Sequence, residues 1–155
     1  MTLPRRVDVA RILTAHTHID PVFLNSPLFQ HPALDAVLGC EVVNKVETLN
    51  PIRSFKGRGA ELYVATELRA GDTLVSASAG NFGQGLAYSA GRRGCKCVVF
   101  AAESANTVKV EAMRRLGAEV HLVGADFDQA KEAAREFAHQ RGFRFVEDGA
   151  EPIIA

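Results

Sequence analysis

The sequence lacks an excess of charge of either sign. Its 155 residues hold 18 lysines and arginines against 18 aspartates and glutamates, and basic residues gather only in short pairs such as Arg92-Arg93 and Arg114-Arg115. Nucleic acids and anionic membranes attract proteins with dense positive patches. We therefore expect no nucleic acid and no membrane among the partners of this chain.

Cysteines are few, and long hydrophobic runs are lacking. The three cysteines are an odd number, and Cys95 and Cys97 share one side of an expected strand, where buried thiols are the simplest interpretation. No apolar run is long enough to span a bilayer, and the first residues lack the apolar core of a secretory signal. These features predict a chain of the reducing cytoplasm.

What is present is the composition of a globular protein and a regular alternation of elements. Hydrophobic residues make up 47% of the chain and charged residues 23%, which suits one domain with a sizeable core. Glycines mark the ends of the expected helices. The pattern predicts strands at 41–46, 73–78, 95–101, 119–123 and 143–146, with helices at 54–69, 81–93, 106–116 and 126–141 between them. Such an alternation indicates an α/β fold, an open parallel sheet with helices on both faces.

The residues before this alternation are less regular. We expect a helix over 5–18, an extended segment over 21–30 and a short helix over 31–38 that Gly39 ends. Ligands of open parallel sheets bind beyond the carboxyl ends of the strands. The loops 46–55, 78–82 and 101–106 are therefore the candidates for a binding site.

The first candidate loop leads to a lysine at the start of a helix. Asn50-Pro51 favours an extended or turn conformation, Ser54 is a good N-cap, and Lys56 then falls in the first helical turn. The partial positive charge of a helix N-terminus disfavours an ammonium group there, and a neutral amine is a nucleophile. The alternative is an ordinary solvated lysine.

The second candidate loop is rich in small residues. It runs from Ser76 to Gly85, where glycines let a ligand approach the backbone and the following helix start offers N–H groups to a carboxylate or phosphate. The alternative is that Ser78 caps the helix and Asn81 is a turn residue with nothing bound. The glycine order, G-x-x-G-x-G, differs from that of dinucleotide sites, which disfavours a nucleotide-binding module.

A metal hydrolase is a further alternative. His16, His18 and Asp20 alternate in a segment that would place them on one face if it were extended, but a metal site needs more ligands at convergent positions. The other histidines lie on different expected elements. We therefore expect no bound metal.

Two motifs resemble those of a known family. Residues 45–60, with the run Ser54-Phe55-Lys56-Gly57, resemble the lysine motif of fold-type II pyridoxal-phosphate enzymes, the threonine/serine dehydratase group. Residues 78–85 resemble the S-x-G-N loop of that group, and residues 109–120 resemble its next stretch. The resemblance covers nearly the whole chain and implies the small domain of a tryptophan synthase β-like fold, incomplete relative to the family.

The resemblance implies a role for each site residue. Lys56 would be the catalytic Schiff-base lysine for pyridoxal 5'-phosphate, and Phe55 would pack beside the cofactor ring. Asn81 would bind the 3-oxygen of the cofactor. The substrate carboxylate would be received by the residues of the second loop, namely Ser78, Ala79, Gly80, Asn81 and Phe82. The implied reaction is dehydration and deamination of L-threonine or L-serine to a 2-oxo acid and ammonia.

Departures from the family leave other interpretations open. Arg53 replaces a common glycine, Phe82 a common histidine and Ala102 a common proline, and the first two lie next to the reacting groups, which leaves the exact substrate open. A β-replacement synthase or a racemase is an alternative, because such enzymes share the same lysine and asparagine. The members of the group are longer than this chain, and the rest of them supplies the phosphate cup and the group facing the pyridine nitrogen. We therefore interpret residues 1–45 as an arm of the larger domain, 46–147 as the cofactor-facing domain and 148–155 as the return to the larger domain.

This organisation has consequences for assembly and activity. Half a cleft would expose apolar surface, which predicts a homo-oligomer, or a chain that needs the C-terminal half of the enzyme. A catalytically incompetent fragment is the alternative to turnover by this chain alone.

Overall fold

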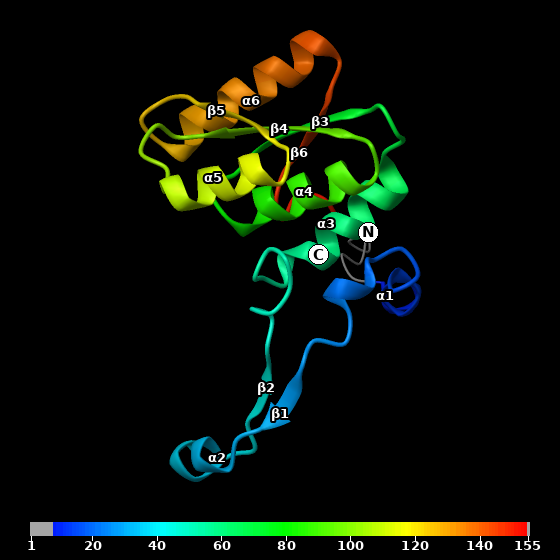
Figure 1. Ribbon diagram of the computed structural model, residues 1–155, viewed down its shortest axis with the longest axis vertical. Helices are drawn as coiled ribbons and strands as arrows, with labels where there is room; N and C mark the ends of the chain where they lie inside the picture. Colours follow the sequence, from blue (N-terminus) through cyan, green and yellow to red (C-terminus); the bar gives the residue numbers. More distant parts are fainter. Residues whose placement is uncertain (1–7, 155) are drawn as a thin grey trace, which may run out of the picture.

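A four-stranded parallel sheet forms the centre of the computed structural model, which describes residues 8–154 (Figure 1). Its strands stand in the order β5-β4-β3-β6 and comprise Glu119–Leu122, Lys96–Ala101, Thr73–Ala77 and Arg144–Val146. Every neighbouring pair is parallel. The carboxyl ends of all four strands therefore meet at one edge of the sheet.

Helices cover both faces of this sheet. Figure 1 shows α6 (Phe127–Arg141) on one side, and α3 (Lys56–Glu67), α4 (Asn81–Arg92) and α5 (Thr107–Arg115) on the other. This confirms the predicted α/β fold with an open parallel sheet. None of the helices within residues 8–154 is long and apolar enough to cross a membrane.

Alternate residues of the central strand β3 pack on the two faces. Leu74 belongs to the apolar cluster with α3, α4 and α5, whereas Val75 belongs to the cluster under α6. Helix α6 meets the sheet with alanines four residues apart, Ala130, Ala134 and Ala138, each at most 2% exposed. Residues at this spacing share one helix face. Their small side chains let the helix lie close to the strands.

The segment before α3 leaves the sheet and forms an extended arm (Figure 1). Its strands β1 (Leu28–Gln30) and β2 (Val43–Lys45) pair antiparallel with each other, and α2 (Pro32–Leu38) lies at the tip of the arm. The expectation that residues 41–46 open the parallel sheet is therefore wrong. Strand periodicity identifies an extended segment but does not identify its pairing partner, and here the partner belongs to the same arm.

Helix α1 (Val9–Ala15) precedes the arm. It begins at Asp8, whose carboxylate accepts a hydrogen bond from the Ala10 N–H at 2.9 Å, as an N-cap does. The helix is shorter than the predicted range of 5–18, of which residues 5–7 lie outside the described part of the chain.

Polar side chains tie the start of the arm to α3 and α4. The Asp20 carboxylate accepts a hydrogen bond from the Tyr88 hydroxyl at 2.9 Å and pairs with Arg92 at 2.8 Å. The buried carboxylate of Glu61 accepts hydrogen bonds from the Asp20 N–H and from the guanidinium of Arg93, both at 3.1 Å. The arm is thus attached through charged hydrogen bonds that link three segments of the chain.

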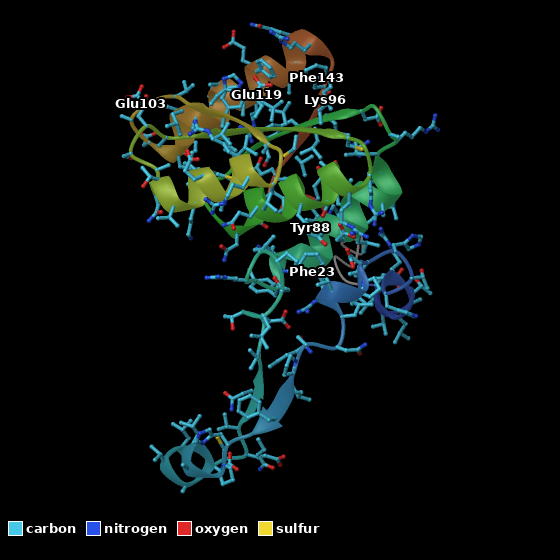
Figure 2. All side chains as sticks on the ribbon, viewed as in Figure 1. Phe23, Tyr88, Lys96, Glu103, Glu119 and Phe143 are labelled. Atoms are coloured by element: carbon cyan, nitrogen blue, oxygen red, sulfur yellow. The ribbon has the colours of Figure 1, made fainter. Side chains whose placement is uncertain are left out.

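An aromatic contact completes this attachment. The rings of Phe23 and Tyr88 meet edge to face with centroids 5.1 Å apart (Figure 2). Gly57 makes room for Phe23, since a Cβ at position 57 would lie 2.2 Å from the Phe23 ring. Phe23 sits in a short 3-10 helix (Pro21–Phe23) and is 1% exposed. The arm is therefore held against the first turn of α3, where the candidate lysine lies.

Candidate active site

One asparagine shapes the loop that leads to the lysine. The Asn50 side-chain oxygen accepts hydrogen bonds from the N–H groups of Ile52 and Ser54, both at 3.2 Å. Its side-chain nitrogen donates to the carbonyls of Glu47 and Ser54, both at 2.9 Å. Asparagine side chains often take the place of backbone partners in turns. The buried Asn50 thereby fixes the loop from residue 50 to residue 54.

The start of α3 follows from this loop. Helix α3 begins at Lys56, with Phe55 in the capping position, and the Ser54 hydroxyl accepts the Lys56 N–H at 3.3 Å. The predicted N-cap thus lies one residue too early in the sequence, although its hydroxyl does bond to the first helical turn. Arg53 has a φ of 54°, a left-handed conformation that costs a residue other than glycine about 1 kcal/mol or more. A glycine, which is common at this position in the family that the motifs resemble, would adopt this conformation without that cost.

The side chain of Lys56 lies among two aromatic rings and one carboxylate. Its Nζ is 2.8 Å from the carboxylate of Asp148, 5.3 Å from the centroid of Phe55 and 6.0 Å from the centroid of Phe82. The Phe55 side chain is exposed, whereas Phe82 is buried. The structure therefore brings Lys56, Phe55 and Phe82 together, as the motifs predict, and adds an acidic partner that the motifs do not contain.

Ser78 serves the second loop as a helix cap. Its hydroxyl oxygen accepts the N–H of Gly83 at 2.9 Å and the N–H of Gly80 at 3.3 Å, and its own N–H bonds to the Phe100 carbonyl at 3.0 Å. This geometry agrees with the alternative interpretation of Ser78 as a cap. The hydroxyl keeps its proton for donation, so the cap and a ligand contact are compatible.

The backbone around Gly80 is open. Within residues 8–154, the N–H groups of Ala79, Asn81 and Phe82 have no hydrogen-bond acceptor. Asn81 itself interacts through its side-chain oxygen with the Gln84 amide at 3.4 Å, a long and weak bond. The start of α4 thus presents free donors, which is the arrangement that binds anionic groups at helix N-termini.

Close packing of α3 on α4 brings the two loops together. A Cβ at Gly85 would lie 3.1 Å from the Ala60 Cβ and 3.3 Å from the Lys56 carbonyl oxygen. A Cβ at Gly83 would lie 2.5 Å from the Met113 sulfur. Glycine at both positions lets α4 approach its neighbours, and the first turns of α3 and α4 meet. This contact places the Lys56 amine beside the Phe82 ring.

A charged pair supports the lysine loop from the side of the arm. Both guanidinium nitrogens of Arg58 bond to the Glu47 carboxylate at 2.9 Å, and the Ser26 hydroxyl donates to the same carboxylate at 2.8 Å. Burial by itself would raise the pKa of Glu47, but the hydrogen bonds from Arg58 and Ser26 outweigh it and lower that pKa. Such a bidentate pair fixes geometry. Arg58 is thus committed to the loop and not to a ligand.

A hollow of about 550 Å³ opens beside Lys56 on the side of α1. The loop 78–82 does not line this hollow, so it reaches the lysine from another side. The walls of the hollow come from α1, from the first turn of α3 and from residues 152–154, and they include Ile12, Ala15, Leu24, Phe55, Lys56, Gly59, Leu62 and Ile154.

The histidines of the metal alternative do not converge. The His16 ring bonds to the Leu13 carbonyl at 2.8 Å, His18 offers its carbonyl to Arg93, and the Asp20 carboxylate is occupied by Tyr88 and an arginine. Across residues 8–154, no group of three or more histidine, cysteine, aspartate or glutamate side chains is placed to hold a metal ion.

Comparison with known proteins connects this geometry to a family. Residues 19–155 match the family described as pyridoxal-phosphate dependent enzyme. A biosynthetic L-threonine dehydratase of Salmonella typhimurium is 38% identical over 131 residues, which cover 83% of this chain and 26% of that protein. A pyridoxal 5'-phosphate-dependent aspartate racemase of known structure has a TM-score of 0.84 at 30% identity, with 98% of this chain and 49% of that chain covered. The processed form of threonine deaminase isoform 2 from Solanum lycopersicum has a TM-score of 0.81 at 28% identity, with 98% and 44% covered.

The chain corresponds to one part of these longer relatives. The chain spans about a quarter of the length of the curated relative and less than half of each solved chain. The match includes all three candidate loops, and the shared fold contains the same parallel sheet flanked by helices. The chain belongs to the family of pyridoxal-phosphate dependent enzymes and has the fold of their fold-type II group.

Proposed function

We propose that this chain forms the lysine-bearing half of a pyridoxal-phosphate-dependent lyase that dehydrates and deaminates L-threonine or L-serine. The observation that carries the proposal is the position of the Lys56 amine, between the rings of Phe55 and Phe82 and next to the open start of α4. An amine of this kind forms a Schiff base with an aldehyde. The similarity to threonine dehydratases supports the substrate.

The residues present fit part of the cofactor and its substrate. We propose that Lys56 holds the cofactor, that Phe55 packs on its ring and that Asn81 hydrogen-bonds its ring oxygen. The free N–H groups of the second loop would bind the substrate carboxylate, with contributions from Ser78, Ala79, Gly80 and Phe82. An added Cβ at Gly80 would meet only the Lys109 amine, at 3.9 Å, so a carboxylate has both space and a nearby cation.

The chemistry divides between the cofactor and the chain. Bound pyridoxal phosphate withdraws electrons from the α-carbon of an amino acid, which weakens the bonds to that carbon. The Lys56 amine is the group of this chain that is placed to take the α-proton. The apolar Phe82 limits water on that side of the amine. The β-hydroxyl then departs as water. Hydrolysis of the unsaturated amine that remains yields a 2-oxo acid and ammonia.

A racemase is the second candidate function. The likeness to an aspartate racemase supports it, because the same lysine can remove and return an α-proton. A β-replacement synthase or a catalytically incompetent fragment would share the lysine as well. Release of a 2-oxo acid from L-threonine indicates the lyase, whereas loss of optical rotation without 2-oxo acid indicates the racemase.

Assembly and location are also proposals. We propose that the chain acts as a homo-oligomer or together with a C-terminal half that supplies the phosphate cup, and that it acts in the cytoplasm. Exposed apolar side chains such as Val37, 80% exposed, and Leu38, 61% exposed, support the assembly. The buried thiols of Cys95 and Cys97 support a reducing compartment.

The test is covalent trapping. The purified chain is mixed with pyridoxal phosphate, reduced with borohydride and mapped by peptide mass spectrometry, with Lys56→Ala and the exposed Lys96→Ala as a matched pair. We expect label on Lys56 in the wild type and in Lys96→Ala, and none at that peptide in Lys56→Ala. Scattered labelling in all three proteins would contradict the proposal.

A further inference from the structure

The amine of Lys56 is held by a carboxylate that lies far away in the sequence. Its Nζ is 2.8 Å from Oδ1 and 2.8 Å from Oδ2 of Asp148, so one ammonium group bridges both oxygens. The neighbouring rings of Phe55 and Phe82 present only their faces to the amine. Among residues 8–154, Asp148 is the one hydrogen-bond acceptor that Nζ contacts.

The sheet sets the position of Asp148. Strand β6 ends at Val146, which stands opposite Ser76 in β3, and the Ser76 hydroxyl donates to the Val146 carbonyl at 2.7 Å. Asp148 follows Val146 by two residues, as Ser78 follows Ser76. Because the two strands are parallel, Asp148 and Ser78 leave the sheet at the same edge and the same level.

The residues around Asp148 are anchored as well. Glu147 pairs with Arg135 of α6 at 2.8 Å. On the other side, Ile154 packs against α3 so closely that a Cβ at Gly59 would lie 2.7 Å from the Ile154 carbonyl oxygen. The segment that carries Asp148 is therefore tied to α6 before it and to α3 after it. Its contact with Lys56 follows from these anchors.

Other charged groups near the amine have different partners or lie farther away. The hollow beside Lys56 is also lined by Asp8, Arg11, His16 and Arg58. Asp8 caps α1, and Arg58 is paired with Glu47. None of these four groups makes a hydrogen bond or ion pair with Lys56 in the described part of the chain.

We infer that Asp148 is a positioning residue that holds the Lys56 amine at the carboxyl edge of the sheet and keeps it from reacting until the site is filled. An ammonium group has no free electron pair, so Nζ must lose one proton before it can attack a carbonyl carbon. While Nζ donates to both oxygens of Asp148, it is directed at the carboxylate and not at a reacting carbon. The inference deepens the proposed function and rests on it for its meaning, but the contact itself can be tested without cofactor.

The experiment is competitive acetylation with a trace of acetic anhydride at neutral pH, followed by peptide mass spectrometry. The measured quantity is the acetylation rate of Lys56 divided by that of Lys96. Lys96 begins β4 at the opposite edge of the sheet (Figure 2). Loss of a partly exposed ion pair of this kind corresponds to about a fivefold change in the relative acetylation rate of the lysine. We expect the relative rate to rise by about fivefold in Asp148→Asn.

Two further variants separate positioning from a general effect on structure. Asp148→Glu keeps the charge and should return the relative rate toward the wild-type value. Asp128→Asn removes an exposed carboxylate of α6 and should leave it unchanged. An unchanged relative acetylation rate in Asp148→Asn overturns the inference. A second comparison uses the wild type alone: if the rate of Lys56 relative to Lys96 is as high in the folded chain as in the urea-unfolded chain, the inference is also overturned. That second comparison needs no variant to fold.

The outcome is distinct from that of the proposed function. If the acetylation rate responds as expected but pyridoxal phosphate is never trapped on Lys56, the inference about Asp148 holds and the proposed function fails. If pyridoxal phosphate is trapped on Lys56 equally fast in the wild type and in Asp148→Asn, and acetylation is also unchanged, the proposed function holds and the inference fails.

Discussion

The carboxylate of Glu61 is fully buried in α3 and accepts a hydrogen bond at 3.1 Å from the guanidinium of Arg93, the C-cap of α4. The same carboxylate oxygen accepts the Asp20 N–H at 3.1 Å. One acidic group therefore joins the two helices that carry the candidate site to the segment that begins the arm.

Removal of this carboxylate should destabilise the fold. Glu61→Ala leaves the Arg93 guanidinium without its buried partner and the Asp20 N–H without an acceptor. Breaking a buried pair costs several kcal/mol, and the partial exposure of Arg93 reduces this to about 2–3 kcal/mol in the free energy of unfolding. Urea unfolding measures it. The control is Glu132→Ala, whose exposed side chain should change the value by less than about 0.5 kcal/mol; equal losses in the two variants would contradict the assignment.

Gly57 should not tolerate a methyl group. In Gly57→Ala the new Cβ would lie 2.2 Å from the Phe23 ring, so the ring must move and its contact with Tyr88 is lost. We expect a loss of about 1–3 kcal/mol, as for other overpacked sites. Gly91→Ala is the matched helical control, because its nearest neighbour would be 3.4 Å away.

A double-mutant cycle isolates the cause. In a Phe23→Ala background the space beside Gly57 is free, so Gly57→Ala should cost much less there than in the wild type. Thermal or urea unfolding of the four proteins gives the coupling energy. Additive effects would show that the ring is not what excludes a side chain at position 57.

The pKa of Asp20 makes stability depend on pH. Burial alone would raise this pKa, but the hydrogen bonds from the Val22 N–H and the Tyr88 hydroxyl, with the charges of Arg92 and Arg93, outweigh burial and lower it. A carboxyl group with a lowered pKa in the folded state stabilises the fold above its unfolded pKa of about 3.9. That contribution is lost as the pH falls through the lowered value.

Replacement of Asp20 should therefore matter more at neutral pH than in acid. We expect Asp20→Asn to lose about 1.5–3 kcal/mol of unfolding free energy at pH 7, the typical value for hydrogen bonds to a charged group, and to differ less from the wild type near pH 3. Urea unfolding at the two pH values tests this. The exposed Asp128→Asn serves as the control, and an equal loss by Asp20→Asn at both pH values would refute the expectation.

The three thiols should differ sharply in reactivity. Burial raises the pKa of Cys97 to about 12 and also raises that of Cys95, whose sulfur lies 3.2 Å from the Arg69 carbonyl. Cys40 is exposed. Since the thiolate is the reactive form, an aromatic disulfide reagent at pH 8 should modify Cys40 quickly and the other two slowly. Cys40→Ser should remove the fast phase, and its persistence would show that a buried thiol is accessible.

Local sequence signals predicted the elements that carry the candidate site. The start of α3 near Lys56 and of α4 near Asn81 follows from loop residues within a few positions of each helix. Ser54 was predicted as the cap and does bond to the Lys56 N–H, because capping depends on neighbours in the chain. The roles of Phe55, Asn81 and the second loop toward ligands stay predictions.

Long-range relationships were not predictable in the same way. The alternation in residues 41–46 did not show that β2 would pair within the arm, since a period of two is common to every strand. Asp148 stands 92 positions from Lys56, and a single aspartate after a strand has no distinguishing pattern. Its position at the carboxyl edge of β6 is the signal that a parallel-sheet argument could have used.

The hydrogen bond from Ser76 to Val146 joins residues 70 positions apart. This separation affects the order in which the contacts of the sheet form during folding. Contacts between distant residues form late in folding because the intervening chain must first be closed into a loop. During synthesis, β3 and the helix that bears Lys56 leave the ribosome well before β6 is made. Nascent chains therefore pass through a stage in which Lys56 lacks its partner Asp148, and the docking of β6 ends that stage.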